Sequence, residues 1–174
     1  MKKLYILFFC YFLNTNGQTV TTFAGSTEGF TDGIGTSAQF NGPAGLDFGP
    51  DGNLYVADRV NHRIRKITPS GVVTTIAGSA EGFADGAGTN ALFNSPMNLT
   101  VDNNGIIYVA DSGNNRIRKI MPDGTVTTLT GSTEGFADGT VSNALFYSPE
   151  GIFITTNGII YIGDTGNQRI RKIM

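Results

Sequence analysis

The sequence predicts an all-β fold in which three copies of one small antiparallel sheet follow one another. The first observation is an internal repeat: Val20-Thr21-Thr22 returns as Val73-Thr74-Thr75 and as Val126-Thr127-Thr128, each time after 53 residues. The second is that each copy contains four short stretches with the alternation or the β-branched content of strands. The third is the 24 glycines, many of which recur at turns between those stretches. Because a repeat of about 50 residues is in the range of propeller blades, we expect three four-stranded blades of a β-propeller.

The four strands of a copy can be followed in the first one. Residues 46–48 alternate apolar and polar side chains, and residues 53–57 are rich in tyrosine and valine. Residues 63–67 and 72–77 give the third and fourth strands. A Pro-x-Gly sequence follows the first strand and another follows the third, and such pairs favour tight turns because proline fixes φ and glycine allows positive φ.

A long glycine-rich segment, residues 25–43, precedes the first strand of the copy. It contains Phe30 and Phe40, and both phenylalanines recur in the later copies. Two buried aromatic rings per copy would pin this segment between neighbouring blades. We therefore expect an ordered connection between blades.

Residues 1–17 have the order of a secretory signal peptide. Lys2 and Lys3 form a positive start, residues 4–13 are apolar, and small or polar residues precede a cleavage position ahead of Gln18. The apolar run is about half of the roughly 20 residues that a spanning helix needs, so we expect cleavage and no membrane span in the mature chain. A secreted, periplasmic or extracellular location follows. Cys10 would be lost with this segment, which leaves no cysteine for a disulfide or a zinc–thiolate site.

The predicted mature domain, residues 18–174, divides into repeats at 20–72, 73–125 and 126–174. The full chain has 12 Lys+Arg and 14 Asp+Glu. Without Lys2 and Lys3 the net charge is 10 − 14 = −4. That balance gives no general attraction to nucleic acid, so we expect no nucleic-acid partner.

Three segments of each copy carry a family resemblance. In the first copy they are residues 42–46, 52–58 and 61–67, which resemble the NHL repeat. Residues 108–117 and 161–170 show the same pattern in the later copies. The resemblance implies a β-propeller, commonly of six blades, and it covers binding scaffolds, sensor domains and a peptide-amidating lyase. It therefore specifies the fold more closely than the function.

Three copies are half of a six-blade ring. The mature chain starts with a fourth-strand sequence at residues 20–24 and ends with a third-strand sequence at residues 169–173. Two chains joined head to tail could exchange that strand and close the ring as a homodimer. The other interpretation is that the chain is a fragment of a longer protein, and the sequence leaves both open.

Two groups of polar residues recur in every copy. One is an Asp/Asn turn motif, for which a structural role is favoured because these side chains cap tight turns and an adjacent arginine can pair with the aspartate; its members are Asp58, Asn61, Asp111, Asn114, Asp164 and Asn167. The other is a basic stripe that could bind phosphate, a sulfated glycan or an acidic protein, although a solvated face is the simpler interpretation. Its members are Arg63, Arg65, Lys66, Arg116, Arg118, Lys119, Arg169, Arg171 and Lys172.

Acidic residues of the long segment are weak calcium candidates, because carboxylates bind Ca²⁺ but the dense spacing of a dedicated calcium loop is lacking. They are Glu28, Asp32, Glu81, Asp85, Glu134 and Asp138. His62, the single histidine, has Asn115 and Gln168 as its equivalents and is interpreted as a turn residue. No other cofactor and no catalytic residue is predicted.

The sequence therefore favours a secreted binding or scaffold module for a protein or glycan ligand over an enzyme. The first alternative is a propeller lyase or lactonase with a metal in the central channel, which needs converging histidines and carboxylates. The second is a sensor or anchoring domain of a larger protein.

Overall fold

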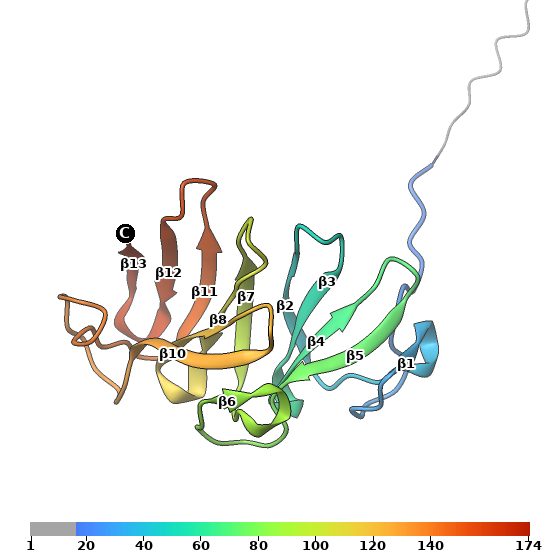
Figure 1. The fold of residues 1–174 in the computed structure, drawn as a ribbon, viewed down its shortest axis with the longest axis horizontal. Helices are drawn as coiled ribbons and strands as arrows, with labels where there is room; N and C mark the ends of the chain where they lie inside the picture. Colours follow the sequence, from blue (N-terminus) through green and yellow to red (C-terminus); the bar gives the residue numbers. More distant parts are fainter. Residues whose placement is uncertain (1–16) are drawn as a thin grey trace, which may run out of the picture.

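The computed structural model describes residues 17–174, and this part of the chain forms three antiparallel sheets, one for each repeat copy (Figure 1). The first sheet has the order β1-β5-β4-β3-β2, with β1 (Gly33–Ile34), β2 (Pro43–Phe48), β3 (Leu54–Asp58), β4 (Arg63–Ile67) and β5 (Val72–Ala77). The second has the order β6-β10-β9-β8-β7, with β6 (Gly86–Ala87), β7 (Pro96–Val101), β8 (Ile107–Asp111), β9 (Arg116–Ile120) and β10 (Thr125–Gly131). The third holds β11 (Pro149–Ile154), β12 (Ile160–Asp164) and β13 (Arg169–Ile173).

Short 3₁₀ turns join the second and third strands of each sheet: η2 (Arg59–Asn61), η4 (Ser112–Asn114) and η5 (Thr165–Asn167). The residue after each turn, His62, Asn115 or Gln168, has a left-handed backbone with φ of 56°. Asparagine and histidine tolerate this conformation better than most residues. The chain thus reverses tightly enough for β4, β9 and β13 to return along the preceding strand.

The first sheet contains the four predicted strands as β2 to β5, and it has one strand more than predicted. The extra strand, β1, belongs to the long segment and pairs with β5 through Gly33 and Val73. In the second sheet β6 pairs with β10 in the same way. The long segment, which continues as η1 (Gly35–Ser37) and η3 (Gly88–Asn90) in the first two copies, is therefore hydrogen-bonded to the sheet that follows it.

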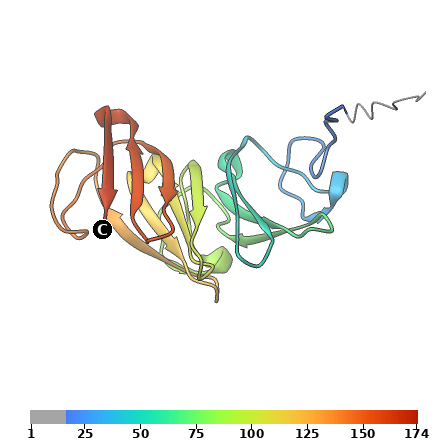
Figure 2. The same cartoon turned by 90° about the horizontal axis from the view of Figure 1, so that it is seen from above.

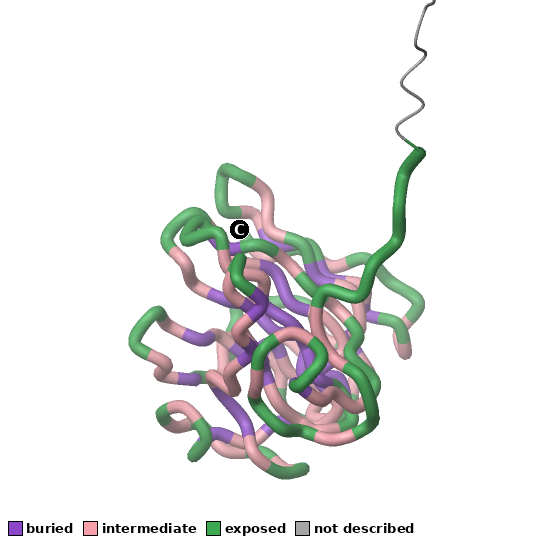
Figure 3. The backbone as a smooth tube through the Cα atoms, turned by 90° about the vertical axis from the view of Figure 1, so that its right-hand side faces the viewer, coloured by how far each residue is buried: buried purple, intermediate pink, exposed green. Residues whose placement is uncertain are grey.

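The prediction of a strand at residues 20–24 is wrong for the single chain. This segment has no regular secondary structure, and residues 17–23 are exposed (Figure 3). A strand requires a neighbouring strand to receive its hydrogen bonds, and none lies beside this segment among the described residues. The predicted signal peptide, apart from Gly17, lies outside the described residues.

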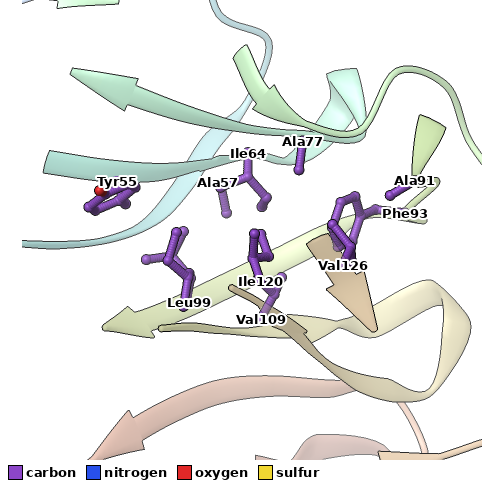
Figure 4. Packing of buried hydrophobic residues seen from close by; sticks show 11 residues of the cluster. Tyr55, Ala57, Ile64, Ala77, Ala91, Phe93, Leu99, Val109, Ile120 and Val126 are labelled. Atoms are coloured by element: carbon purple, nitrogen blue, oxygen red, sulfur yellow. The ribbon is translucent and has the colours of Figure 1, made fainter. Parts of the chain in front are cut away.

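The three sheets stand side by side, and the second lies between the other two (Figure 2). Between the first and second sheets, Ile64 and Ala77 pack with Leu99, Val109 and other apolar side chains (Figure 4). Ile117 of the second sheet packs in the same way with Ile152 and Ile162 of the third. Each sheet thus stabilises its neighbour through apolar burial, as expected for stacked repeats.

The two phenylalanines of the long segment have different environments, so the prediction that both are buried is wrong for one of them. Phe93 and Phe146, the equivalents of Phe40, are 0% and 2% exposed. Phe30 and its equivalents Phe83 and Phe136 are between 46% and 60% exposed. None of the helices in the described part of the chain is long and apolar enough to cross a membrane.

Candidate binding face

A buried arginine lies at the centre of the polar structure of each sheet. In the second sheet this residue is Arg118 on β9, which has no exposed surface. Its Nη1 donates to Asp111 Oδ2 at 2.8 Å, and its Nη2 donates to Asp85 Oδ1 at 2.7 Å. Two backbone carbonyls, those of Leu92 and Ala84, accept the remaining bonds from the same two nitrogens. The guanidinium thus connects strand β8 to residues 78–96, which are the long segment of the second copy.

Asp111, the aspartate of β8, accepts two further hydrogen bonds. Asp111 Oδ1 accepts the backbone N–H of Asn94 at 2.7 Å, and Oδ2 accepts Asn114 Nδ2 at 2.8 Å. Asn114 also donates to the carbonyl of Gly82. Burial raises the pKa of Asp111, while the bonds from Asn114, Asn94 and Arg118 oppose that rise. The partners therefore offset part of the cost of burying this carboxylate, and burial remains the larger effect.

The same network recurs in the other two sheets. In the first, Asp58 and Asp32 accept from Arg65, with N–O distances of 2.6 and 2.8 Å. In the third, Asp164 and Asp138 accept from Arg171. The Asp/Asn turn motif is thus part of an ion-pair network. In the first copy the arginine that pairs with Asp58 is Arg65, seven residues further along the chain, and not Arg63, the nearer arginine.

Phenylalanine rings cover the faces of these guanidinium groups. Arg118 lies 4.9 Å from the centroid of Phe83 and 5.0 Å from that of Phe93. Arg171 has the same relation to Phe136 and Phe146. Aromatic faces attract cations, and a planar guanidinium can stack on rings while its edges donate hydrogen bonds. Lysine could not satisfy both requirements.

The burial of two of its arginines shows that the prediction of a continuous basic stripe is wrong. Arg65 and Arg118 are 0% exposed, so they cannot contact a ligand from solvent. Lys66 and Lys119 are half-buried and point to the opposite side of their strand from these arginines. The nine predicted residues therefore do not form one surface.

The calcium candidates are placed in this network too. Asp32 accepts from Arg65 and also from the N–H and hydroxyl of Thr75, and Asp85 has the same relation to Arg118 and Thr128. Glu28 accepts from Asn41 Nδ2. Within residues 17–174, no three His, Cys, Asp or Glu side chains gather in a way that could hold a metal ion. The aspartates Asp32 and Asp85 thus act here as partners of arginine and threonine, and Asp138 as a partner of arginine.

One arginine of each copy remains at the surface. Arg63, Arg116 and Arg169 lie 4.3, 3.9 and 4.0 Å from the ring centroids of Phe30, Phe83 and Phe136. Arg116 Nη1 donates to the carbonyl of Asn114, and its equivalents make the same bond. Within the part of the chain that the structure describes, no carboxylate forms an ion pair with these three arginines. We call these three Arg–Phe pairs the binding face.

One signal could have found the binding face in the sequence: Phe30 and Arg63 recur together in every copy. The structure adds that, of the arginines at positions 63 and 65, only the second has an aspartate partner. The sequence does not show which arginine meets the aspartate, because Asp32 lies 33 residues from Arg65. His62, interpreted as a turn residue, accepts the backbone N–H of Ser95 at 3.1 Å and thus ties the first sheet to the second.

A model of the NHL repeat matches residues 40–67, 93–120 and 146–173. The chain is 35% identical over 150 residues to the chloroplastic protein SUPPRESSOR OF QUENCHING 1 of Arabidopsis thaliana, and 31% identical over 167 residues to NHL repeat-containing protein 2 of Gallus gallus. These matches cover 79% and 86% of this chain but only 14% and 23% of the relatives. The chain belongs to the NHL repeat family.

Solved structures show the same architecture. A protein of unknown function from Bacteroides thetaiotaomicron VPI-5482 matches with a TM-score of 0.71 and 32% identity, over 83% of this chain and 37% of that one. An auxiliary nutrient binding protein from the same organism matches with a TM-score of 0.68 and 28% identity, over 74% of this chain and 36% of that one. A gluconolactonase from Xanthomonas campestris, at 17% identity, and a streptogramin B lyase, at 18%, share the fold alone.

Replacing the buried Arg118 should lower the stability of the fold more than replacing its half-buried neighbour Arg116. Arg118→Met leaves Asp111 buried without its cation, so we expect a loss of about 3–5 kcal/mol in the free energy of unfolding. Arg116→Met removes the same group two residues away at the surface and should cost about 1 kcal/mol or less. Urea denaturation followed by circular dichroism measures both, and equal losses would contradict the assignment.

Calcium should leave the thermal stability unchanged, because the ion would have to displace a guanidinium from each aspartate. Melting temperatures in about 1 mM CaCl₂, a concentration that fills extracellular calcium modules, and in EDTA should agree. A rise with calcium that Asp85→Asn abolishes would show that the acidic segment is a metal site after all.

Proposed function

We propose that this chain is a binding module whose ligand is an acidic glycan, held on the binding face. The observation that carries the proposal is the repeated Arg–Phe pair without a carboxylate partner. Phe30, Phe83 and Phe136 are large apolar side chains that the fold leaves at the surface, each beside an arginine. Such a group attracts carboxylate or sulfate through the guanidinium and offers an apolar edge beside it.

The arginines are held in position before any ligand arrives. Each side chain is fixed by a ring on one side and by a carbonyl acceptor at Nη1, so little conformational entropy remains to be lost on binding. The three pairs repeat with the sheets, and a polymer with regularly spaced acidic groups could engage more than one of them. Several weak contacts on one chain then give avidity without a deep pocket.

The related structures support binding over catalysis. The neighbours at 28% and 25% identity include auxiliary nutrient binding proteins from Bacteroides thetaiotaomicron and Bacteroides ovatus, whereas the lactonase and lyase are more distant. A location outside the cytoplasm, proposed from residues 1–17, would bring the chain to extracellular glycans. An acidic protein surface would meet the same cations and is the alternative ligand.

Retention on immobilised heparin and on polygalacturonate tests the proposal, with neutral dextran as the uncharged comparison. Wild-type protein should be retained by at least one polyanion and released by salt, because counterions screen the contacts. Changing Arg63, Arg116 and Arg169 together to glutamine should abolish retention.

The matched control changes Lys66, Lys119 and Lys172 together to glutamine, which alters the net charge by the same amount. This variant should keep most of its retention. Equal losses in the two triple variants would mean that net charge alone is responsible, and failure of the wild type to bind either polyanion would contradict a glycan ligand.

A further inference from the structure

The third sheet has an open edge where the other two have a strand. β4 pairs with β5 and β9 pairs with β10, whereas β13 pairs with β12 alone among the described residues. A hollow of about 660 Å³ lies beside β13, lined by residues 169–174 together with Phe136, Asp138 and Phe146. The hollow thus occupies the position of a fourth strand.

Asp138 gives this open edge a specific hydrogen-bond acceptor. Its equivalents Asp32 and Asp85 each accept a backbone N–H and a hydroxyl from a threonine of the fourth strand, Thr75 or Thr128. Asp138 accepts from Arg171 alone among the described residues, and its side chain is 79% exposed against 46% for the other two. A strand that carries threonine at the matching position would give Asp138 the same two additional hydrogen bonds.

The chain contains one more copy of that strand sequence. Val20-Thr21-Thr22 repeats Val73-Thr74-Thr75 and Val126-Thr127-Thr128, and these three residues are exposed with no strand beside them. Thr22 is the equivalent of Thr75 and Thr128. The segment enters the fold at the end opposite to β13 (Figure 1), so it does not reach β13 within the described part of one molecule and is free to pair with β13 of a second molecule.

The free face of the first sheet and the free face of the third sheet, which we call the end faces, correspond to the two sides of the contact between neighbouring sheets. Ile64 and Leu99 are buried together between the first and second sheets. Their equivalents at the ends are open: Ile170 is 77% exposed on the third sheet, and Leu46 is 60% exposed on the first. Stacking the third sheet of one molecule on the first sheet of another would bury both.

The end faces also carry substitutions that suit each other. At the inner junctions a polar side chain accepts a backbone N–H of the next sheet: Asp47 Oδ2 accepts from Val101, and Thr100 Oγ1 accepts from Ile154. The third member of that series is Phe153, which cannot accept. Phe48, the equivalent of Val101, needs no such acceptor because its N–H already donates to Asp47 Oδ1 at 2.8 Å.

Phe48 and Phe153 are 65% and 62% exposed, one on each end face. At an end-to-end junction the two rings would replace the hydrogen bond of the inner junctions with an aromatic contact. Aromatic pairs contribute more than their buried area alone. The end faces are therefore complementary to each other.

We propose that a second copy of this chain docks head to tail on both end faces, and that residues 20–24 of each copy form the fourth strand of the other's third sheet. Thr22 then donates its N–H and hydroxyl to Asp138. Two such junctions close a ring of six sheets with twofold symmetry, which leaves no open edge. The proposal does not rest on the glycan ligand, although Arg169 and Phe136 of the binding face also line the hollow beside β13.

Light scattering after size exclusion tests the proposal on protein expressed from the full reading frame, with the single-chain mass taken by mass spectrometry under denaturing conditions. We expect twice the single-chain mass at all protein concentrations. A single-chain mass would overturn the proposal. A mass that keeps growing with concentration would overturn the closed ring, because open head-to-tail contacts give filaments.

Thr22→Pro tests the strand itself. Proline removes the N–H that we assign to Asp138, and residue 22 makes no hydrogen bond within the described part of a single chain, so the fold should survive. The mass should fall to that of one chain, with an unchanged far-ultraviolet circular dichroism spectrum. Thr22→Ser, which keeps both donors, should remain a dimer. A dimer that persists in Thr22→Pro would overturn the strand exchange.

Two further variants test the head-to-tail contact. Ile170→Asp and Leu46→Asp each place a charge on one end face, so each alone should be monomeric. Their mixture contains one junction without a mutation, and it should form a dimer of one chain of each kind. A mixture that stays monomeric would show that these two faces do not meet.

Discussion

A guanidinium packed against one or two phenylalanine rings and held by two aspartates is the interaction on which each sheet depends. Arg118 reaches Asp111 at the end of β8, Asp85 in the long segment and the backbone of that segment at two places. Asp85 in turn binds Thr128 of β10. The network thus connects the second, third and fourth strands to the long segment that lies against them. Few apolar contacts could connect four segments with such defined geometry.

This interaction also determines what remains at the surface. Phe83 contacts the buried Arg118 and the half-buried Arg116, so a single ring serves both the interior network and the binding face. Asp85 and Asp111 of the same copy are already bound to the interior arginine. Arg116 is therefore left as a cation without an acidic partner, on a chain whose overall charge is negative. The proposed ligand chemistry follows from that division of the charges.

The repeat predicted much of the fold, because strand sequences that recur with a fixed period must occupy equivalent places. Residues 63–67 and 72–77 were predicted at the bounds that the structure gives. The strand at 20–24 was not found, since no strand lies beside that segment among the described residues of a single chain. The two-residue strand β1 carried no pattern long enough to predict.

The candidate site could be predicted only in part. Arg63 and Arg65 lie on the same side of β4, and alternation alone does not reveal that Arg65 is fully buried while Arg63 stays half-buried. The two arginines differ in burial because Asp32 and Asp58 both form ion pairs with Arg65. The contact between Asp32 and Arg65 joins residues that are far apart in the sequence. The sequence does not distinguish Phe30 from Phe40 either. Phe40 lies over the buried Arg65, whereas Phe30 lies over the half-buried Arg63.

A double-mutant cycle on Asp111 and Arg118 tests most directly whether the buried ion pair holds the sheet together. The cycle compares Asp111→Leu, Arg118→Met and the double variant by urea denaturation. We predict a coupling free energy of about 2–3 kcal/mol, near the upper end of what contacting residues show, because each single change leaves a buried charge without its partner. Losses that add to within about 0.5 kcal/mol would mean that the two residues act separately, and would contradict the account.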